Sequence, residues 1–240
     1  MRLAVVSDIH GNVSALEAIA LDLKRQSPDL VVHGGDLALI GPRPAEVIDF
    51  IRAAGWPGVL GNTDQILFDS SGRADQVAGA PQLRGWLKTL FDDFVPWAQE
   101  HLSRDQISWL EGLPLQWRSD GVVLVHAAPD DLWRAPMPDS PVDDMRRVYG
   151  VLGSRLAVYG HIHRPFVKDV GGFTVANAGS VGLPYDGDPR ASYLLIDDEV
   201  PAVRRVEYDL DQAASDAEAA EFPLATWLTD VQHQARFRSP

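Results

Sequence analysis

Residues 3–10 read LAVVSDIH, a short apolar run that ends on two residues able to bind a metal, and the fold depends on this stretch. Four apolar residues bounded by polar ones are typical of a buried strand. Asp8 and His10 stand two residues apart, so at a strand end their side chains point to the same side. The pattern predicts a buried strand that carries a carboxylate and an imidazole at its carboxyl end.

The same pattern recurs four times further along the chain. The apolar runs span residues 30–33, 58–60, 122–125 and 156–159, and the polar residues that follow them are Asp36, Asn62, His126, His161 and His163. In an open α/β sheet, ligands bind beyond the carboxyl ends of the strands. We therefore expect two Asp, one Asn and four His to converge at one edge of the sheet, which predicts a site for two metal ions.

Helical segments alternate with the first three runs. Residues 13–23 and 44–51 have apolar positions at helical spacing, with Asn12 at an N-cap and Pro44 in a first turn. This alternation predicts parallel strands joined by right-handed crossovers.

Beyond residue 65 the expected secondary structure is helical, then made of short strands, and then helical again. Residues 65–115 are expected to be helical and irregular, with a capping box formed by Ser103 and Gln106. Short strands are expected after that, over residues 115–118, 122–126, 156–160, 166–170, 173–176, 193–196 and 203–206. We expect a single domain over 1–240, with two facing sheets and with residues 210–240 packed on it as a C-terminal helical extension.

Composition limits the possible partners. The chain has 34 acidic and 21 basic residues and a formal net charge of −13, which disfavours a polyanion such as nucleic acid. There is no cysteine, so disulfides and thiolate metal sites are excluded. No signal peptide or membrane-length apolar stretch is recognisable. We expect a cytoplasmic protein that binds a small phosphorylated substrate, with no membrane or nucleic-acid partner, and self-association stays open.

The donor types indicate which metals fit. Carboxylate oxygen and imidazole nitrogen suit manganese, our first choice, and also iron, zinc, cobalt or nickel, whereas calcium prefers oxygen alone. A carboxylate can bridge two ions, and Asp36 is the candidate because it lies centrally in the series. Two such ions activate a shared hydroxide for in-line attack on a phosphorus atom.

The ordered motifs resemble those of the calcineurin-like metallophosphoesterase family. They are Asp8-x-His10, Gly35-Asp36, Gly61-Asn62-x-Asp64, His126 and Gly160-His161-x-His163. Residues 177–184, followed by 187–193, further resemble a small bacterial and archaeal phosphodiesterase branch. The resemblance implies a four-layer α/β/β/α sandwich with two facing mixed sheets and a dinuclear centre. By analogy, metal one would take Asp8, His10, Asp36 and His163, and metal two would take Asp36, Asn62, His126 and His161.

The chain departs from the common pattern of that family at one position. Thr63 stands where many members have a histidine that assists the leaving group. A hydroxyl is a poor proton source near neutral pH, so the group that protonates the leaving group is not identified. Asp64 loses its usual partner, and either a helix N-cap or a supporting role at the site would explain it.

The expected function is a dinuclear phosphoesterase that hydrolyses phosphodiesters or small nucleotides. The candidate catalytic residues are Asn62, Asp64 and His126, and the candidate substrate-binding residues are Asn177, Ser180 and Arg190. Arg43, Arg134 and Arg164 also fall near the site loops in sequence, and His33 is either a support of the site or a structural histidine. Three alternatives remain, namely a phosphomonoesterase or protein phosphatase, a DNA nuclease, and a non-catalytic scaffold. The sequence identifies neither the natural substrate nor the native metal.

Overall fold

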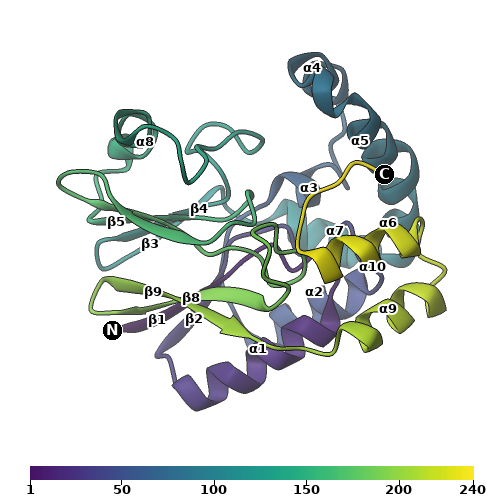
Figure 1. Cartoon of the computed structure of the whole chain (residues 1–240), viewed down its shortest axis with the longest axis horizontal. Coiled ribbons are helices and arrows are strands. Elements are labelled where there is room, and N and C mark those ends of the chain that lie inside the picture. Colours follow the sequence, from purple (N-terminus) through teal and green to yellow (C-terminus); the bar gives the residue numbers. More distant parts are fainter.

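The computed structural model describes residues 1–240 and places two sheets face to face with helices on their outer sides (Figure 1). The first sheet has the strand order β2-β1-β8-β9 and the second has the order β3-β4-β5-β7-β6. The strands are β1 (Arg2–Val6), β2 (Leu30–His33), β3 (Gln116–Ser119), β4 (Val122–Val125), β5 (Leu156–Tyr159), β6 (Phe166–Asp169), β7 (Thr174–Asn177), β8 (Ala191–Asp197) and β9 (Val200–Val206). Both sheets mix parallel and antiparallel pairs, as predicted.

Alternation along the strands creates the four layers. In β1, Leu3 and Val5 face the second sheet and pack with residues of β4 and β5. Ala4 and Val6 face the other way, into the cluster that holds helix α1 (Val13–Gln26). The second sheet is covered in the same way by α8 (Val142–Tyr149), so the α/β/β/α prediction is confirmed.

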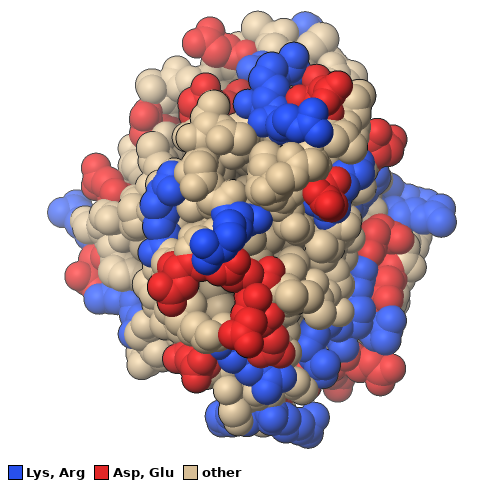
Figure 2. Space-filling model, turned by 90° about the vertical axis from the view of Figure 1, so that its left-hand side faces the viewer, with Lys and Arg blue, Asp and Glu red and all other residues tan.

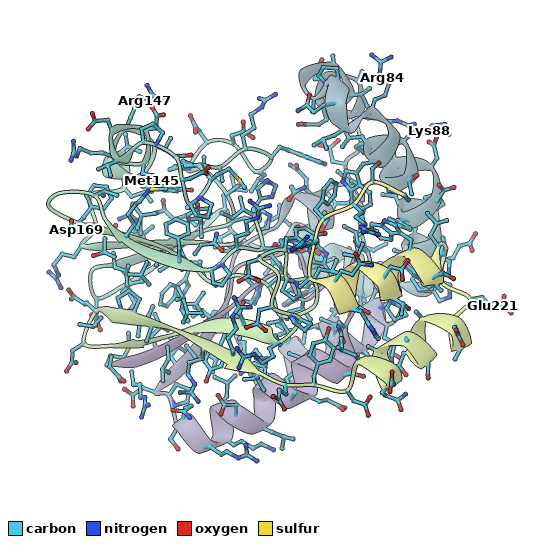
Figure 3. The ribbon with its side chains drawn as sticks, viewed as in Figure 1. Arg84, Lys88, Met145, Arg147, Asp169 and Glu221 are labelled. Atoms are coloured by element: carbon cyan, nitrogen blue, oxygen red, sulfur yellow. The ribbon has the colours of Figure 1, made fainter.

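Helix α8 shows how the outer layer is held. Met145 is fully buried against the second sheet, whereas Arg147 on the same helix is exposed (Figure 3). The apolar face of the helix covers the sheet and its charged face meets solvent.

The predicted helices near the N-terminus form with their expected ends. The Asn12 side chain accepts a hydrogen bond from the backbone N–H of Ala15 at 3.0 Å, which caps α1. Helix α2 (Pro44–Ala54) begins at Pro44 and ends at Gly55, whose φ of 66° is left-handed. Strands β1 and β2 are parallel, as the alternation predicted.

The strand predicted over residues 58–60 is wrong. Only Gly58 forms a bridge, with His33, and the backbone N–H of Leu60 donates to the carbonyl of Pro114 outside the sheet. The chain then enters helix α3 (Asn62–Gln65) at once. The run is therefore too short to extend the sheet.

The middle and the end of the chain are helical, as expected. The elements are α4 (Arg73–Gly79), η1 (Pro81–Leu83), α5 (Arg84–Thr89), η2 (Leu90–Phe94), α6 (Val95–His101), α7 (Arg104–Glu111), η3 (Gly150–Leu152), α9 (Leu210–Ala219) and α10 (Ala225–Gln234). The capping box of Ser103 and Gln106 is present at the start of α7. Trp227 of α10 packs against Trp86 and Phe94, which joins the C-terminal helices to the middle of the chain.

The molecular surface matches the composition. On the side of the molecule where the N-terminus lies, basic and acidic groups are interspersed (Figure 2), so that face presents no continuous basic area for a polyanion. No helix in the structure combines the length and the apolar character that crossing a bilayer would need.

Candidate metal centre

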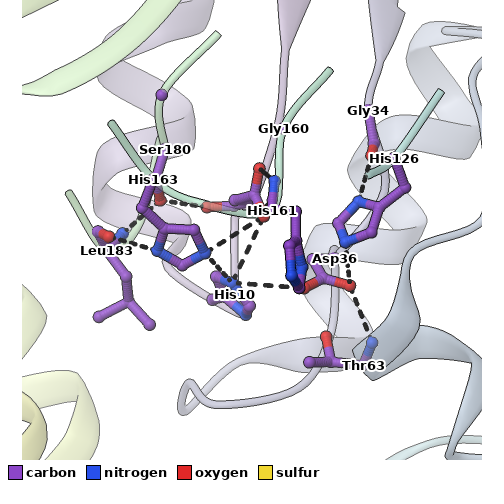
Figure 4. Close-up of polar contacts among 12 residues, drawn as sticks. His10, Gly34, Asp36, Thr63, His126, Gly160, His161, His163, Ser180 and Leu183 are labelled. Atoms are coloured by element: carbon purple, nitrogen blue, oxygen red, sulfur yellow. Dashed lines mark hydrogen bonds and ion pairs between the residues drawn. The ribbon is translucent and has the colours of Figure 1, made fainter. Parts of the chain in front are cut away.

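The seven predicted donors come together where strands of both sheets end, and Figure 4 shows five of them, His10, Asp36, His126, His161 and His163. Asp8 and His10 follow β1, Asp36 follows β2, and His126 follows β4. His161 and His163 follow β5, and Asn62 is the first residue of α3. The convergence that we expected at one sheet edge is therefore shared by two facing sheets.

The backbone conformation at these positions differs from the expected one. The φ angles are left-handed at Asp8 (56°), His10 (50°), Asp36 (54°), His161 (64°) and His163 (55°). The side chains of Asp8 and His10 do point to the same place, with His10 Nε2 4.0 Å from Asp8 Oδ1, but β1 ends at Val6, so the strand geometry given as the reason is wrong. Non-glycine residues rarely adopt this conformation, and strain of this kind concentrates at functional sites.

We call Asp8, His10 and His163 the first donor group. The Nε2 atoms of His10 and His163 are 3.1 Å apart, and Asp8 Oδ1 lies 3.2 Å from His163 Nε2. One ligand atom from each residue falls within 4.8 Å of the other two, close enough for a single ion.

We call Asp36, Asn62, His126 and His161 the second donor group. Asn62 Oδ1 lies 2.8 Å from His126 Nε2 and 3.0 Å from His161 Nδ1. Asp36 Oδ1 lies 3.5 Å from His126 Nε2, while its Oδ2 lies 3.8 Å from His10 Nε2 in the first group. Asp36 is thus the carboxylate that stands between the two groups.

Backbone carbonyls set the protonation of all four imidazoles. Nδ1 faces the carbonyl of Leu39 in His10 (2.7 Å), of Gly34 in His126 (2.7 Å) and of Leu183 in His163 (2.5 Å). In His161 the ring is reversed, and Nε2 faces the Trp133 carbonyl at 3.0 Å. A carbonyl can only accept, so each of these nitrogens carries a proton, and in the neutral imidazole the other nitrogen keeps a lone pair.

The consequence is that lone pairs face lone pairs in both groups. His10 Nε2 faces His163 Nε2, and the Asn62 oxygen faces one nitrogen of His126 and one of His161. Acceptors at such distances repel one another unless a cation lies between them. The residues present therefore fit a pair of divalent ions held by nitrogen and oxygen.

The pKa shifts in the buried site favour the binding of metal ions. Burial and the facing His163 lower the pKa of His10 to about 4. Burial and the neighbouring His126 lower the pKa of His161 to about 4 in the same way. Burial alone would raise the pKa of Asp8, but His163, His126 and His10 together outweigh it, and the pKa falls well below the usual range. These groups are ready to coordinate at neutral pH.

His126 behaves differently from the other two. Burial opposes its charge, but Asp36 and Asp8 raise its pKa above the ordinary value. A proton therefore competes for the second group more strongly than for the first.

Glycines allow the close approach of the loops. A Cβ on Gly61 would lie 2.1 Å from Asp36 Oδ1, and one on Gly160 would lie 2.4 Å from Asp8 Oδ2. Any larger residue at either position would displace a candidate ligand.

Thr63 and Asp64 hold Asp36 and the backbone that follows it in place. The backbone N–H of Thr63 donates to Asp36 Oδ1 at 2.9 Å, while the buried Thr63 hydroxyl has no partner. The Asp64 carboxylate accepts from the backbone N–H groups of Leu37 and Ala38 at 3.0–3.1 Å. Gly61, not Asp64, precedes α3 as its N-cap, so Asp64 supports the loop that carries Asp36. Burial, with the charge of Asp36, raises the pKa of Asp64 to about 7.

The predicted substrate-binding residues have other partners. Asn177 donates to the carbonyl of Gly160 at 2.6 Å, and the Ser180 hydroxyl donates to the carbonyl of Asp8 at 2.7 Å. Both residues are completely buried. Arg190 forms an exposed pair with Asp188. We now propose that Asn177 and Ser180 support the loops that carry the donors.

Sequence reasoning missed the groups that orient the histidines. These are backbone carbonyls, which leave no mark in a sequence. It also missed Tyr185, whose ring stacks on His163 with centroids 4.4 Å apart and an interplanar angle of 17°. The sequence held one clue to Tyr185, because this residue lies between residues 177–184 and 187–193, which resemble the phosphodiesterase branch. His33 is fully buried and packs against Trp109, and neither of its ring nitrogens has a hydrogen-bond partner.

Comparisons with known proteins agree with this geometry. A model of the calcineurin-like phosphoesterase superfamily domain matches residues 1–199. An uncharacterized protein of Methanocaldococcus jannaschii is 30% identical over 234 residues, which cover 88% of this chain and 89% of that protein. A probable cyclic nucleotide phosphodiesterase of Synechococcus is 26% identical over 211 residues, covering 78% and 82%. The crystal structure of a metallophosphoesterase from Sphaerobacter thermophilus superposes with a TM-score of 0.78 and 26% identity, over 98% of this chain and 99% of that one.

Proposed function

The chain belongs to the calcineurin-like phosphoesterase superfamily, and from its own site we propose that it is a dinuclear, metal-dependent phosphodiesterase. The proposal depends on one observation: within each donor group, acceptor atoms of different residues face one another at 2.8–3.1 Å. Four carbonyls hold the imidazole protons away from the site, so seven donors share two positions for a cation.

The roles of the residues follow from this arrangement. The first donor group would hold one ion and the second group the other, with Asp36 reaching both. When bound, such ions supply an activated water and offset the charge that develops on the phosphoryl oxygens. The N–H of Thr63 keeps Asp36 in place, and Asp64 fixes the backbone that follows it. Manganese is our first choice, because the donor set combines nitrogen with oxygen.

A hollow beside the second donor group supports a diester substrate. It has a volume of about 380 Å³ and includes Gln65, Gln76 and Trp133, whose carbonyl orients His161. Its wall mixes aromatic, amide and hydroxyl groups, and it also carries three acids, Asp69, Asp130 and Asp131, with one cation, Arg73, which is paired with Asp92. An uncharged second ester group fits such a wall, whereas a further anion would be repelled.

The relative named as a probable cyclic nucleotide phosphodiesterase supports the same preference for diesters. The partner that we propose is therefore a small phosphorylated molecule with an organic group on each side of the phosphorus.

The test compares bis(4-nitrophenyl) phosphate with 4-nitrophenyl phosphate as substrates of the manganese-loaded protein. We expect the diester to have the higher kcat/KM, chelation to abolish turnover, and added manganese to restore it. Preferred hydrolysis of the monoester would favour a phosphomonoesterase instead. Two bound ions per chain without turnover of either ester would favour a non-catalytic scaffold.

A further inference from the structure

A second hollow lies next to the first donor group. It has a volume of about 430 Å³ and is lined by Arg164, Tyr185, Asp186, Gly187, Arg236 and Phe237. Tyr185 joins the hollow to the metal centre, because its ring stacks on the imidazole of His163. Arg164 follows His163 directly in the chain. The hollow therefore lies directly beside the first donor group.

The two arginines of this hollow have no acidic partner. The Nε atom of Arg164 donates to the carbonyl of Tyr185 at 3.1 Å, and its other two nitrogens make no hydrogen bond. Arg236 forms neither a hydrogen bond nor an ion pair and is exposed. Asp186, the one acid in the wall, is paired with Arg205. The hollow thus offers two uncompensated positive charges, although the chain as a whole carries −13.

Other arginines near the site loops contrast with this pair. Arg43 is bound by Glu46 and Asp216, and Arg134 is bound by Asp131. Each of these guanidinium groups already has an acidic partner within the protein, whereas those of Arg164 and Arg236 have none.

The C-terminal tail holds Arg236 at this place. The N–H of Gly187 donates to the carbonyl of Ala235 at 2.9 Å, just before Arg236. Just after it, the ring of Phe237 meets the rings of Tyr185 and Trp86 at centroid distances of 5.6 and 5.7 Å. The backbone at Arg236 is thus held on both sides, while its exposed side chain has no partner in the protein.

We propose that Arg164 and Arg236 bind a second anionic group of the substrate, a phosphate or carboxylate, beyond the phosphoryl group at the metals. A guanidinium binds such groups through two parallel N–H donors. This inference rests on the proposed function and makes it more specific. The substrate carries an uncharged group toward Trp133 and an additional negative charge toward Tyr185.

The experiment uses alkylene diphosphonates with spacers of increasing length as inhibitors of bis(4-nitrophenyl) phosphate hydrolysis. Alkyl monophosphonates of matching length are the reference ligands. With the wild-type, manganese-loaded protein, we expect one spacer length to inhibit about tenfold more strongly than its monophosphonate, or better. Arg164→Gln and Arg236→Gln should each remove about tenfold of that advantage.

Arg238→Gln is the matched control, because Arg238 lies on the same tail but outside the hollow. It should keep the wild-type preference for the diphosphonate. Equal inhibition by both ligand types at every spacer length, or an advantage that survives in both variants, would overturn the inference. If no diester is hydrolysed, calorimetric binding of the same ligands to the same proteins still gives the ratio. Loss of turnover and loss of the second anion site are thereby read separately.

Discussion

Replacing His33 by leucine should remove part of the protein's sensitivity to acid. His33 is fully buried against Trp109, and both of its ring nitrogens lack a hydrogen-bond partner. Burial lowers the pKa of this imidazole from the ordinary value of 6.5 to about 3. The unfolded chain therefore takes up a proton below pH 6.5 that the folded chain refuses until about pH 3.

Linkage gives the size of the effect. Because the folded-state pKa is the lower one, this residue has its full favourable contribution above pH 6.5 and loses it as the pH falls toward 3. Between pH 7 and pH 5, the two pKa values predict a loss of about 2 kcal/mol in the free energy of unfolding. Leucine has no proton to take up, and it also removes two buried nitrogens without partners, so the variant should be at least as stable at pH 7.

The assay is urea unfolding of chelator-treated protein at pH 7, 6 and 5, which keeps metal binding out of the comparison. Wild-type protein should lose about 2 kcal/mol more than His33→Leu between pH 7 and pH 5. His233→Leu, at an exposed position, is the control and should follow the wild type. If the free energy of unfolding fell by the same amount with pH in wild type and His33→Leu, the reasoning would be refuted, because the imidazole would then be protonated equally in the folded and unfolded chains.

Three further predictions concern the metal centre. Asp36→Asn should lower the metal content from two ions to one or fewer per chain, and it should lower kcat/KM by about 100-fold or more, because Asp36 faces both donor groups. Unchanged metal content by elemental analysis would contradict the bridging role. Rates for a series of aryl and alkyl diesters should fall steeply as the leaving group becomes less acidic, and Thr63→His should flatten that dependence. Similar rates for alkyl and nitrophenyl esters in the wild type would mean that another acid acts. As the pH falls from 7 to 5, manganese titrations should show that the second donor group loses affinity first. The reason is that the pKa of His126 is raised, whereas that of His10 is about 4. Equal loss of affinity in both groups would refute this order.

The sequence predicted those parts of the molecule that depend on pattern and order. Apolar runs that end on Asp8, Asp36, His126 and His161 located the strands and the edge where the donors meet. The four layers and the mixed sheets were predicted through the resemblance that these motifs carry. Residues 58–60 failed because the chain makes a single bridge to β2 at Gly58 and then turns into α3 at Asn62.

Other features have no signature in a single sequence. Asp and His tolerate a left-handed φ better than most residues, but the loops around Asp8 and His10 decide that these two residues adopt it. Backbone carbonyls such as that of Leu183 look alike at every position, although they decide which imidazole nitrogen faces the site. Arg236 reaches the hollow beside Arg164 only through the packing of the C-terminal tail, across more of the chain than local patterns describe.

Anomalous diffraction from crystals grown with manganese is the most direct measurement of the metal centre. We predict two peaks roughly 3.5–4 Å apart, one within coordination distance of Asp8, His10 and His163 and the other of Asn62, His126 and His161, with Asp36 touching both. A single peak elsewhere in the molecule, or no peak among these residues at saturating manganese, would contradict the account.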